Sequence, residues 1–262
     1  MEALLAKKAF ICDMDGVIYH GNLLLDGVKE FVDWLGEGGR QYIFLTNSSE
    51  RSPRELRQKL LRLGLDVGEE HFYTSALATA SFLKSQCPGG SAYVIGEPGL
   101  VGALYDAGFS MNDMNPDYVV VGETSSYSYE KILKAAALVR KGAKLIGTNP
   151  DITGPIENGI APATKALISP IEMTCARKAY FVGKPNPLMM KHAQKKLGIP
   201  PTDIAIIGDR MDTDIIAGIE SEMDTVLVLS GVTSRESMRE YPYRPSYVLS
   251  GVGEIPRFAQ GR

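Results

Sequence analysis

The chain has 262 residues, of which 44% are hydrophobic and 23% charged, a composition typical of one large or two modest globular domains. Its 28 Lys and Arg against 31 Asp and Glu give a formal net charge of −3, so no basic surplus indicates a nucleic-acid partner. The apolar runs are short and the first residues do not resemble a secretory signal, so we expect no membrane partner. The three cysteines form no CxxC pair, which favours a reducing, cytoplasmic location.

Short apolar runs alternate with amphipathic helical segments along the chain. One helix start is well marked, because Ser52, Pro53 and Glu55 combine an N-cap, a first-turn proline and a capping box. Ser75 and Ser128 are expected to cap two further helices. This alternation predicts an α/β fold with doubly wound, parallel sheets covered by helices. Strands are expected at 9–12, 41–45, 91–95, 118–121, 144–147, 180–182, 203–207, 225–229 and 247–249.

The middle of the chain has a β-α-β-α-β pattern of its own. We therefore expect an inserted α/β domain at 80–179, within a core sheet formed by 1–79 and 180–262. The stretch 147–162 is rich in Pro and Gly, and we expect it to be a long loop. A loop of that length inside a compact domain is usually functional or disordered.

Two carboxylates follow the first predicted strand. If strand geometry continues through Asp15, the side chains of Asp13 and Asp15 point to one face, and Gly16 permits a sharp turn directly afterwards. Ligands of parallel α/β sheets bind at the carboxyl ends of strands. The pair could hold a divalent cation or divide nucleophilic and acid/base roles. The alternative is a pair of solvated loop acids.

Three further strand ends have complementary chemistry. Thr46 and Asn47 offer hydroxyl and amide donors that suit phosphate oxygens, Lys184 offers an ammonium group, and Asp209 and Asp214 lie in an acidic loop that enters a helix. Each motif alone is common in turns and helix starts. Together they predict a cation-plus-phosphate site, because phosphoryl transfer needs a metal, donors for the phosphate oxygens, a cation and a nucleophile.

These four motifs, in this order, resemble those of the haloacid dehalogenase (HAD) superfamily. The insertion between the second and third motifs resembles the α/β cap of its NagD-like branch, and the likeness extends over essentially the whole chain. Supporting matches are Thr148–Asp151, 182–187 and Leu229–Val232. The resemblance implies a Rossmann-like HAD core with an inserted α/β cap domain.

The resemblance also implies catalytic roles. Asp13 would attack the phosphoryl group and form an aspartyl-phosphate, while Asp15 would protonate the leaving oxygen and then act as base on water. Thr46 and Lys184 would hold the transferred phosphoryl group. A raised pKa of Asp15 would suit this role, and a neighbouring carboxylate such as Asp13 would raise it.

The implied cofactor is Mg²⁺. Its ligands would be the Asp13 carboxylate, the Asp15 main-chain carbonyl and Asp209, with Asp214 supporting the metal directly or through water. Oxygen ligands of this kind are those that Mg²⁺ prefers.

The predicted loop at 148–158 is our candidate for the substrate-facing element. Asn149 and Asp151 could hydrogen-bond hydroxyl groups or a ring edge of the substrate. The alternative is that Asn-Pro-Asp only forms a tight turn.

The sequence thus favours a Mg²⁺-dependent phosphomonoester hydrolase of small phosphorylated metabolites, with sugar phosphates, nucleoside monophosphates and 4-nitrophenyl phosphate as substrate types. The alternatives are a phosphoryl transferase or mutase on the same core, a non-hydrolytic phospho-acceptor signalling protein, and an idle binding protein. Exposed strands of the insertion could pair into a homodimer.

Overall fold

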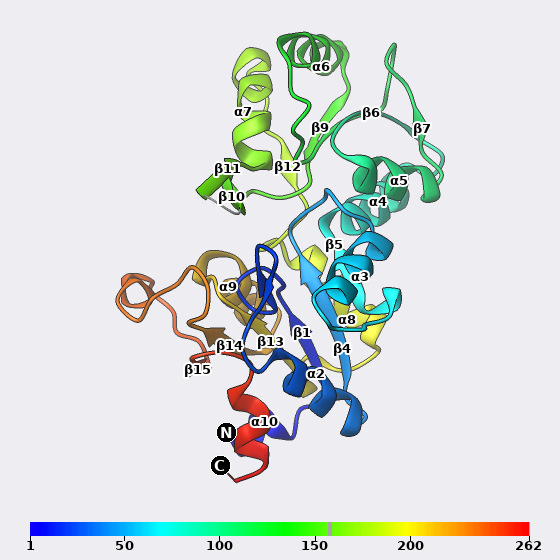
Figure 1. Cartoon of the computed structure of the whole chain (residues 1–262). Coiled ribbons are helices and arrows are strands. Elements are labelled where there is room, and N and C mark those ends of the chain that lie inside the picture. The colour runs from blue at the N-terminus through cyan, green and yellow to red at the C-terminus, as the bar shows by residue number, and fades with distance from the viewer. Residues whose placement is uncertain (157–158, 262) are drawn as a thin grey trace. The chain divides into compact units, whose positions relative to one another are not determined.

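The computed structural model describes residues 1–156 and 159–261 (Figure 1). The chain forms two compact units. The first contains Met1–Thr46, Arg57–Tyr73 and the segment from Lys184 onward, and the second contains Asn47–Leu56 and Thr74–Gly183. The predicted insertion at 80–179 lies within the second unit, and its role as a specificity domain stays a prediction.

A six-stranded sheet forms the centre of the first unit, in the order β15-β14-β13-β1-β4-β5. The pairings from β15 through β4 are parallel. All residues of β1 and β13 are buried, as expected for central strands covered on both faces. The strands are β1 (Ala9–Cys12), β4 (Gln41–Thr46), β5 (Phe72–Thr74), β13 (Ile204–Gly208), β14 (Asp224–Val228) and β15 (Tyr247–Leu249).

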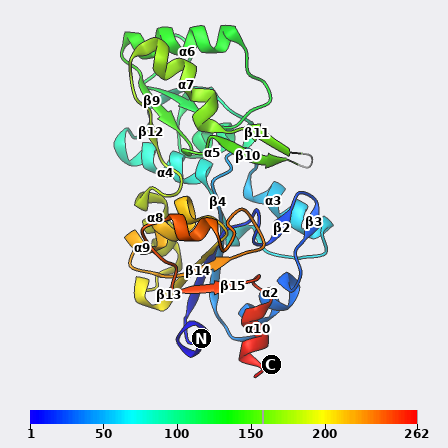
Figure 2. The same cartoon turned by 90° about the vertical axis from the view of Figure 1, so that its left-hand side faces the viewer.

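Helices cover this sheet on both sides. Figure 2 shows α8 and α9 on one side of it and α2 and α10 on the other, which is the doubly wound arrangement predicted from the sequence. A small hairpin follows β1, with strands β2 (Tyr19–His20) and β3 (Leu23–Leu24). The α-helices are α1 (Glu2–Leu5), α2 (Val28–Glu37), α3 (Pro53–Arg62), α8 (Pro187–Leu197), α9 (Ile216–Glu220) and α10 (Glu254–Ala259). Short 3₁₀ or π segments are η1 (Glu69–His71), η2 (Pro201–Asp203), η3 (Met211–Ile215) and η4 (Ser237–Glu240).

The second unit has a five-stranded parallel sheet in the order β12-β9-β8-β6-β7. Apolar residues of β8 and β9 pack against α6 and α7 in one buried cluster. The strands are β6 (Ser91–Ile95), β7 (Ser110–Met111), β8 (Tyr118–Val121), β9 (Lys144–Gly147) and β12 (Tyr180–Phe181). The helices are α4 (Ser75–Gln86), α5 (Pro98–Asp106), α6 (Tyr129–Lys141) and α7 (Thr164–Cys175).

The expected helix caps are confirmed at two of three places. The Ser52 backbone N–H donates to Glu55 Oε2 at 2.8 Å, and the Glu55 N–H donates to Ser52 Oγ at 3.3 Å, which is a complete capping box. Ser128 caps α6. The prediction for Ser75 is wrong, because Thr74 has the extended backbone of an N-cap and accepts from the Leu77 N–H at 3.2 Å.

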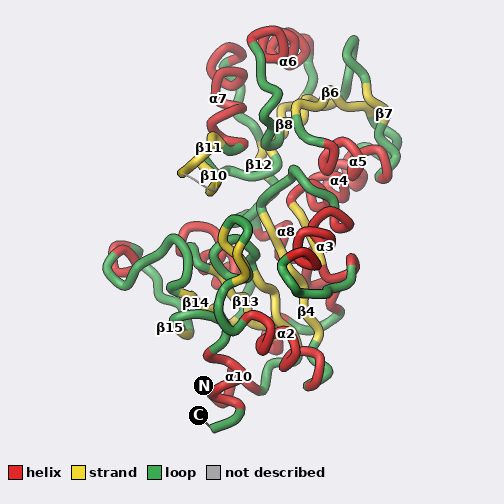
Figure 3. Tube along the Cα trace, viewed as in Figure 1, coloured by secondary structure: helices red, strands yellow, loops and turns green. Residues whose placement is uncertain are grey.

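The expected loop at 147–162 contains a hairpin of β10 (Thr153–Ile156) and β11 (Gly159–Pro162), which is visible in Figure 3. The sequence did not predict these strands because Pro and Gly usually indicate turns. Both residues are nevertheless tolerated in edge strands. Residues 157–158, which belong to the candidate substrate loop, lie outside the described residues.

The expected core strand at 180–182 belongs to the other sheet. Its Phe181 pairs with Gly147 of β9, where an added Cβ would come within 2.3 Å of the Phe181 ring. The two-residue strand is partly exposed, so its apolar pattern did not indicate which sheet it joins. In the described part of the chain, no helix is long and apolar enough to span a bilayer.

Candidate active site

The order of the first sheet brings three predicted motifs to one edge. Strand β1 lies between β13 and β4, with Cys12 opposite Ile207 on one side and Phe44 on the other. Asp13 and Asp209 directly follow β1 and β13, and Thr46 is the last residue of β4. Because the strands are parallel, these residues lie at the same carboxyl edge, which is where ligands bind in such sheets.

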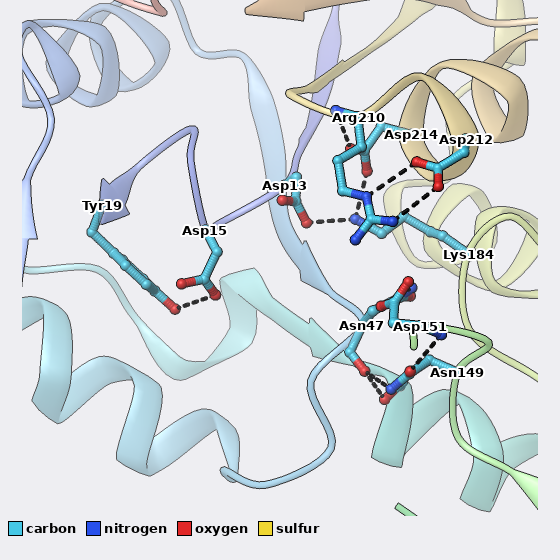
Figure 4. Close-up of polar contacts among 11 residues, drawn as sticks. Asp13, Asp15, Tyr19, Asn47, Asn149, Asp151, Lys184, Arg210, Asp212 and Asp214 are labelled. Atoms are coloured by element: carbon cyan, nitrogen blue, oxygen red, sulfur yellow. Dashed lines mark hydrogen bonds and ion pairs between the residues drawn. The ribbon is translucent and has the colours of Figure 1, made fainter. Parts of the chain in front are cut away.

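Three carboxylates meet at this edge. One oxygen each of Asp13, Asp209 and Asp214 lies within 4.8 Å of the others. Asp209 and Asp214 are only 2% and 0% exposed. Lys184 Nζ donates to Asp13 Oδ1 at 2.5 Å and to Asp214 Oδ1 at 2.6 Å (Figure 4). We call these four residues the carboxylate cluster.

Burial dominates the electrostatics of the carboxylate cluster. It raises the pKa of Asp13 well above its usual value, although the nearby Lys184 charge opposes the rise. Burial and the charge of Asp214 raise the pKa of Asp209 to about 7. Burial alone would lower the pKa of Lys184, but Asp13 and Asp214 outweigh it and raise that pKa, so the ammonium stays charged. Three acids share one ammonium group, so a further cation could stabilise their ionised forms.

The donor set fits a divalent metal. Hard cations such as Mg²⁺ take carboxylate oxygens at about 2.0–2.1 Å, so opposite ligands lie roughly 4 Å apart. The 4.8 Å limit on the three carboxylate oxygens is close to that span. Asp13, Asp209 and Asp214 are therefore the residues that could hold such an ion.

Glycines let neighbouring loops approach Asp209. Gly16 has φ of +78°, and a Cβ there would lie 2.6 Å from Asp209 Oδ2. A Cβ at Gly231 would lie 2.0 Å from the same oxygen. The Val232 N–H donates to Asp209 Oδ2 at 2.7 Å, and Ser230 Oγ donates to the Gly16 carbonyl at 2.7 Å. The segment Leu229–Val232, found in the sequence only as a matching motif, thus braces both acidic loops.

Asp15 is not part of the carboxylate cluster. Strand β1 ends at Cys12, so the condition for Asp13 and Asp15 to share a strand face is not met. In Figure 4 the Asp13 carboxylate points toward Lys184, whereas Asp15 accepts a hydrogen bond from the Tyr19 hydroxyl at 3.2 Å. The implied roles of Asp15 and its carbonyl stay predictions.

The other predicted binding residues belong to different units: Thr46 to the first, and Asn47, Asn149 and Asp151 to the second. Thr46, 5% exposed, ends the first segment of the first unit, and Asn47 begins the second unit. There, Asn47 Nδ2 donates to Asp151 Oδ2 at 3.0 Å. Asn149 is 0% exposed, and its side-chain amide donates to the Asn47 carbonyl at 2.7 Å while its Oδ1 accepts from the Asp151 N–H at 3.1 Å. The structure shows a bracing role for Asn149, and contact with substrate stays a prediction.

Glu123 is a partly buried acid that sequence reasoning missed. Its carboxylate accepts from the Asn149 amide at 2.5 Å, from the Ser49 N–H at 3.1 Å and from the Ser49 hydroxyl. Burial raises its pKa, although these donors act in the opposite direction. The available signal was an acid two residues after the buried strand Tyr118–Val121. We call Asn47, Ser49, Glu123, Asn149 and Asp151 the amide network.

Comparison with known proteins agrees with this geometry. A haloacid dehalogenase-like hydrolase family model matches residues 10–110, and a HAD-hydrolase-like model matches residues 181–255. Dihydroxyacetone phosphatase of Corynebacterium glutamicum is 42% identical over 94% of this chain and 90% of its own length. The ribonucleotide monophosphatase NagD of Escherichia coli is 42% identical over 95% of this chain and 98% of its own length.

Solved structures show the same relationship. The structure of Escherichia coli NagD superposes with a TM-score of 0.90 at 41% identity, covering 95% of this chain and 98% of that one. A 4-nitrophenylphosphatase from Thermotoga maritima gives a TM-score of 0.93 at 33% identity, covering 97% and 98%. The chain therefore belongs to the haloacid dehalogenase superfamily, in its NagD-like branch of phosphoric monoester hydrolases.

Proposed function

We propose that this phosphatase hydrolyses small phosphorylated metabolites with Mg²⁺ through an aspartyl-phosphate on Asp13. The observation that carries the proposal is the carboxylate cluster, in which Lys184 bridges Asp13 and Asp214 beside Asp209 at the edge of a parallel sheet. A nucleophile, a fixed cation and a set of metal-type ligands in one place are what phosphoryl transfer to an aspartate needs.

Asp13 is the proposed nucleophile. Only 13% of its side chain is exposed, and Lys184 holds one carboxylate oxygen, so the group has few orientations available. Fixing a nucleophile before substrate arrives removes entropy that the reaction would otherwise lose. Burial raises the pKa of Asp13 and so disfavours its ionised form, which is the form that attacks, and the charge of Lys184 opposes this rise.

Mg²⁺ is the proposed cofactor, held by Asp13, Asp209, Asp214 and the Asp15 carbonyl. When bound, the ion would offset the charge of the phosphate oxygens and of the crowded carboxylates. Thr46 and Asn47 are proposed to donate to phosphate oxygens, together with Lys184. We propose that Asp15 protonates the leaving oxygen and later accepts a proton from water.

The names of the relatives support the substrate class. One is a dihydroxyacetone phosphatase, another a ribonucleotide monophosphatase and a third an acid sugar phosphatase, so each acts on a small phosphate ester. We propose that this chain also acts on such esters, and that Asn149 and Asp151 of the second unit contribute to selecting among them. A cytoplasmic location agrees with its three free cysteines.

The test is phosphate release from 4-nitrophenyl phosphate, with Mg²⁺ and with EDTA, for wild type and Asp13→Asn. We expect turnover that requires Mg²⁺ and falls by more than about a thousandfold in the variant. Asp212→Asn is the matched control, because Asp212 lies in the same acidic loop but pairs with Arg210 and is 49% exposed. Turnover that survives Asp13→Asn, or that is equal in EDTA, would refute the proposal. Formation of an isomeric sugar phosphate without free phosphate would instead indicate a mutase.

A further inference from the structure

Tyr19 is a buried tyrosine whose hydroxyl contacts the proposed acid/base. Its side chain is 2% exposed, and its hydroxyl donates to Asp15 Oδ2 at 3.2 Å (Figure 4). The backbone sets this approach, because the Gly16 N–H donates to the Tyr19 carbonyl at 2.9 Å and the Tyr19 N–H donates to the Met14 carbonyl at 3.2 Å. The segment 14–19 is thus closed on itself, with the phenol held against Asp15.

Lys59 of α3 contacts the face of the Tyr19 ring. Its Nζ lies 3.5 Å from the centroid of the Tyr19 ring. A cation over an aromatic face is attracted by the ring electrons, and by the same electrostatics it makes the phenol a better hydrogen-bond donor. Tyr19 is therefore fixed by its own backbone and by a neighbouring helix.

From this geometry we infer that Tyr19 is a positioning residue for Asp15. The hydroxyl of Tyr19 holds Asp15 through Oδ2, so the carboxyl group that is proposed to give its proton to the leaving oxygen is fixed in place. This step rests on the proposed function. In it, the bond between the leaving oxygen and phosphorus breaks, the bond between Asp13 and phosphorus forms, and the Asp15 proton moves to the leaving oxygen.

A general acid must be within hydrogen-bond reach of the atom that it protonates. The hydrogen bond from Tyr19 limits the orientations of the Asp15 carboxyl group, and fixed orientation removes entropy that the reaction would otherwise lose. Loss of this bond should therefore slow the reactions in which the leaving oxygen needs the proton.

The dependence on the leaving group distinguishes this role from a merely structural one. We would measure kcat/KM for a series from 4-nitrophenyl phosphate through phenyl phosphate to an alkyl phosphate, since kcat/KM reports the steps through departure of the leaving group. In Tyr19→Phe we expect a loss of about tenfold for the alkyl ester and less than about twofold for 4-nitrophenyl phosphate, whose leaving group needs little protonation. Lys59→Gln should change the series in the same direction by a smaller factor.

Tyr73→Phe is the matched control, because it removes a buried hydroxyl that pairs with His192 at 3.1 Å. It should leave the leaving-group dependence unchanged. A Tyr19→Phe enzyme that loses activity equally across the series, or not at all, would overturn the inference while the wild type remains an active phosphatase. A wild type without Mg²⁺-dependent turnover would overturn the proposed function as well, so the two failures are distinct.

Discussion

Acids that are buried or partly buried and hydrogen-bonded occur in both units of this protein, but they are paired in different ways. In the first unit, the carboxylate cluster sets Asp13, Asp209 and Asp214 around the ammonium of Lys184. In the second unit, Glu123 of the amide network accepts hydrogen bonds from Ser49 and Asn149. In the first arrangement three acids share one cationic partner, whereas neutral donors satisfy the acid of the second. We propose that the first cluster receives a cation and that the second holds its loops in place.

Removing the ammonium should have the largest effect. In Lys184→Met, turnover should fall by more than about a thousandfold, because both the proposed phosphate-binding charge and the partner of Asp13 are lost. Without metal, the free energy of unfolding should fall by about 3–5 kcal/mol, since buried carboxylates lose their partner. Denaturant unfolding in EDTA measures this loss.

The control for Lys184→Met is Lys134→Met in the second unit. Lys134 is paired with Asp113 at 3.5 Å, and the side chains are 39% and 70% exposed, so we expect a loss of less than about 1 kcal/mol. Equal losses of stability in the two variants would mean that the ion pairs of Lys184 contribute no more to stability than an exposed ion pair does.

The second-largest effect should be on Mg²⁺ affinity, which we expect to depend on the carboxylate cluster and not on the amide network. Asp209→Asn should weaken Mg²⁺ binding, measured by titration calorimetry, by about 10- to 100-fold, because one charged ligand becomes neutral. Glu123→Gln should leave the Mg²⁺ affinity unchanged. If Glu123→Gln weakens binding as much as Asp209→Asn does, the assignment of the metal to the first unit is wrong.

The pH dependence of stability without metal follows from the raised pKa values. With the pKa of Asp209 at about 7 and that of Asp13 also raised, the folded protein binds more protons than the unfolded chain between about pH 4 and pH 7. Stability in EDTA should therefore fall as pH rises through this window. The raised pKa of Lys184 acts only above about pH 10 and does not enter it.

Mg²⁺ should reverse this loss, since it binds the deprotonated carboxylates. We expect Mg²⁺ to raise the melting temperature by on the order of 5 °C at pH 8 and by much less at pH 5. Equal stabilisation at both pH values would show that the carboxylate cluster does not titrate as described.

The smallest effect should come from an isosteric change in the amide network. Glu123→Gln keeps the volume and one acceptor, so we expect a loss of about 1 kcal/mol in stability and less than a threefold change in kcat/KM. Glu123→Ala, which leaves the donors of Ser49 and Asn149 without that acceptor, should cost about 2–4 kcal/mol. If Glu123→Gln loses as much stability as Glu123→Ala, then the charge of Glu123, and not its shape, stabilises the amide network.

The sequence predicted those parts of the site that depend on strand order. Asp13 and Asp209 follow buried apolar runs whose length and composition identify central strands, and parallel pairing then places them at one edge. The same reasoning indicated the doubly wound fold, because alternating strands and helices have few other ways to bury their apolar faces.

Features that depend on tertiary contacts were not predictable from the pattern. Phe181 lies in the second sheet because Gly147 leaves room for its ring, a fit that no periodicity reveals. The turn after Cys12 directs Asp15 to Tyr19, since a strand pattern does not specify where the strand stops. The role of Glu123 could not be predicted, because the sequence does not show that Ser49 lies next to the end of strand β8.

The central claim is that Asp13 receives the phosphoryl group, and direct mapping of the intermediate tests it most directly. The enzyme would be mixed with 4-nitrophenyl phosphate and Mg²⁺, quenched in acid within one turnover and analysed by peptide mass spectrometry. The account predicts a phosphoryl group on Asp13 that is absent in Asp13→Asn and in EDTA. A phosphoryl group on another residue, or complete turnover by the Asp13→Asn variant, would contradict it.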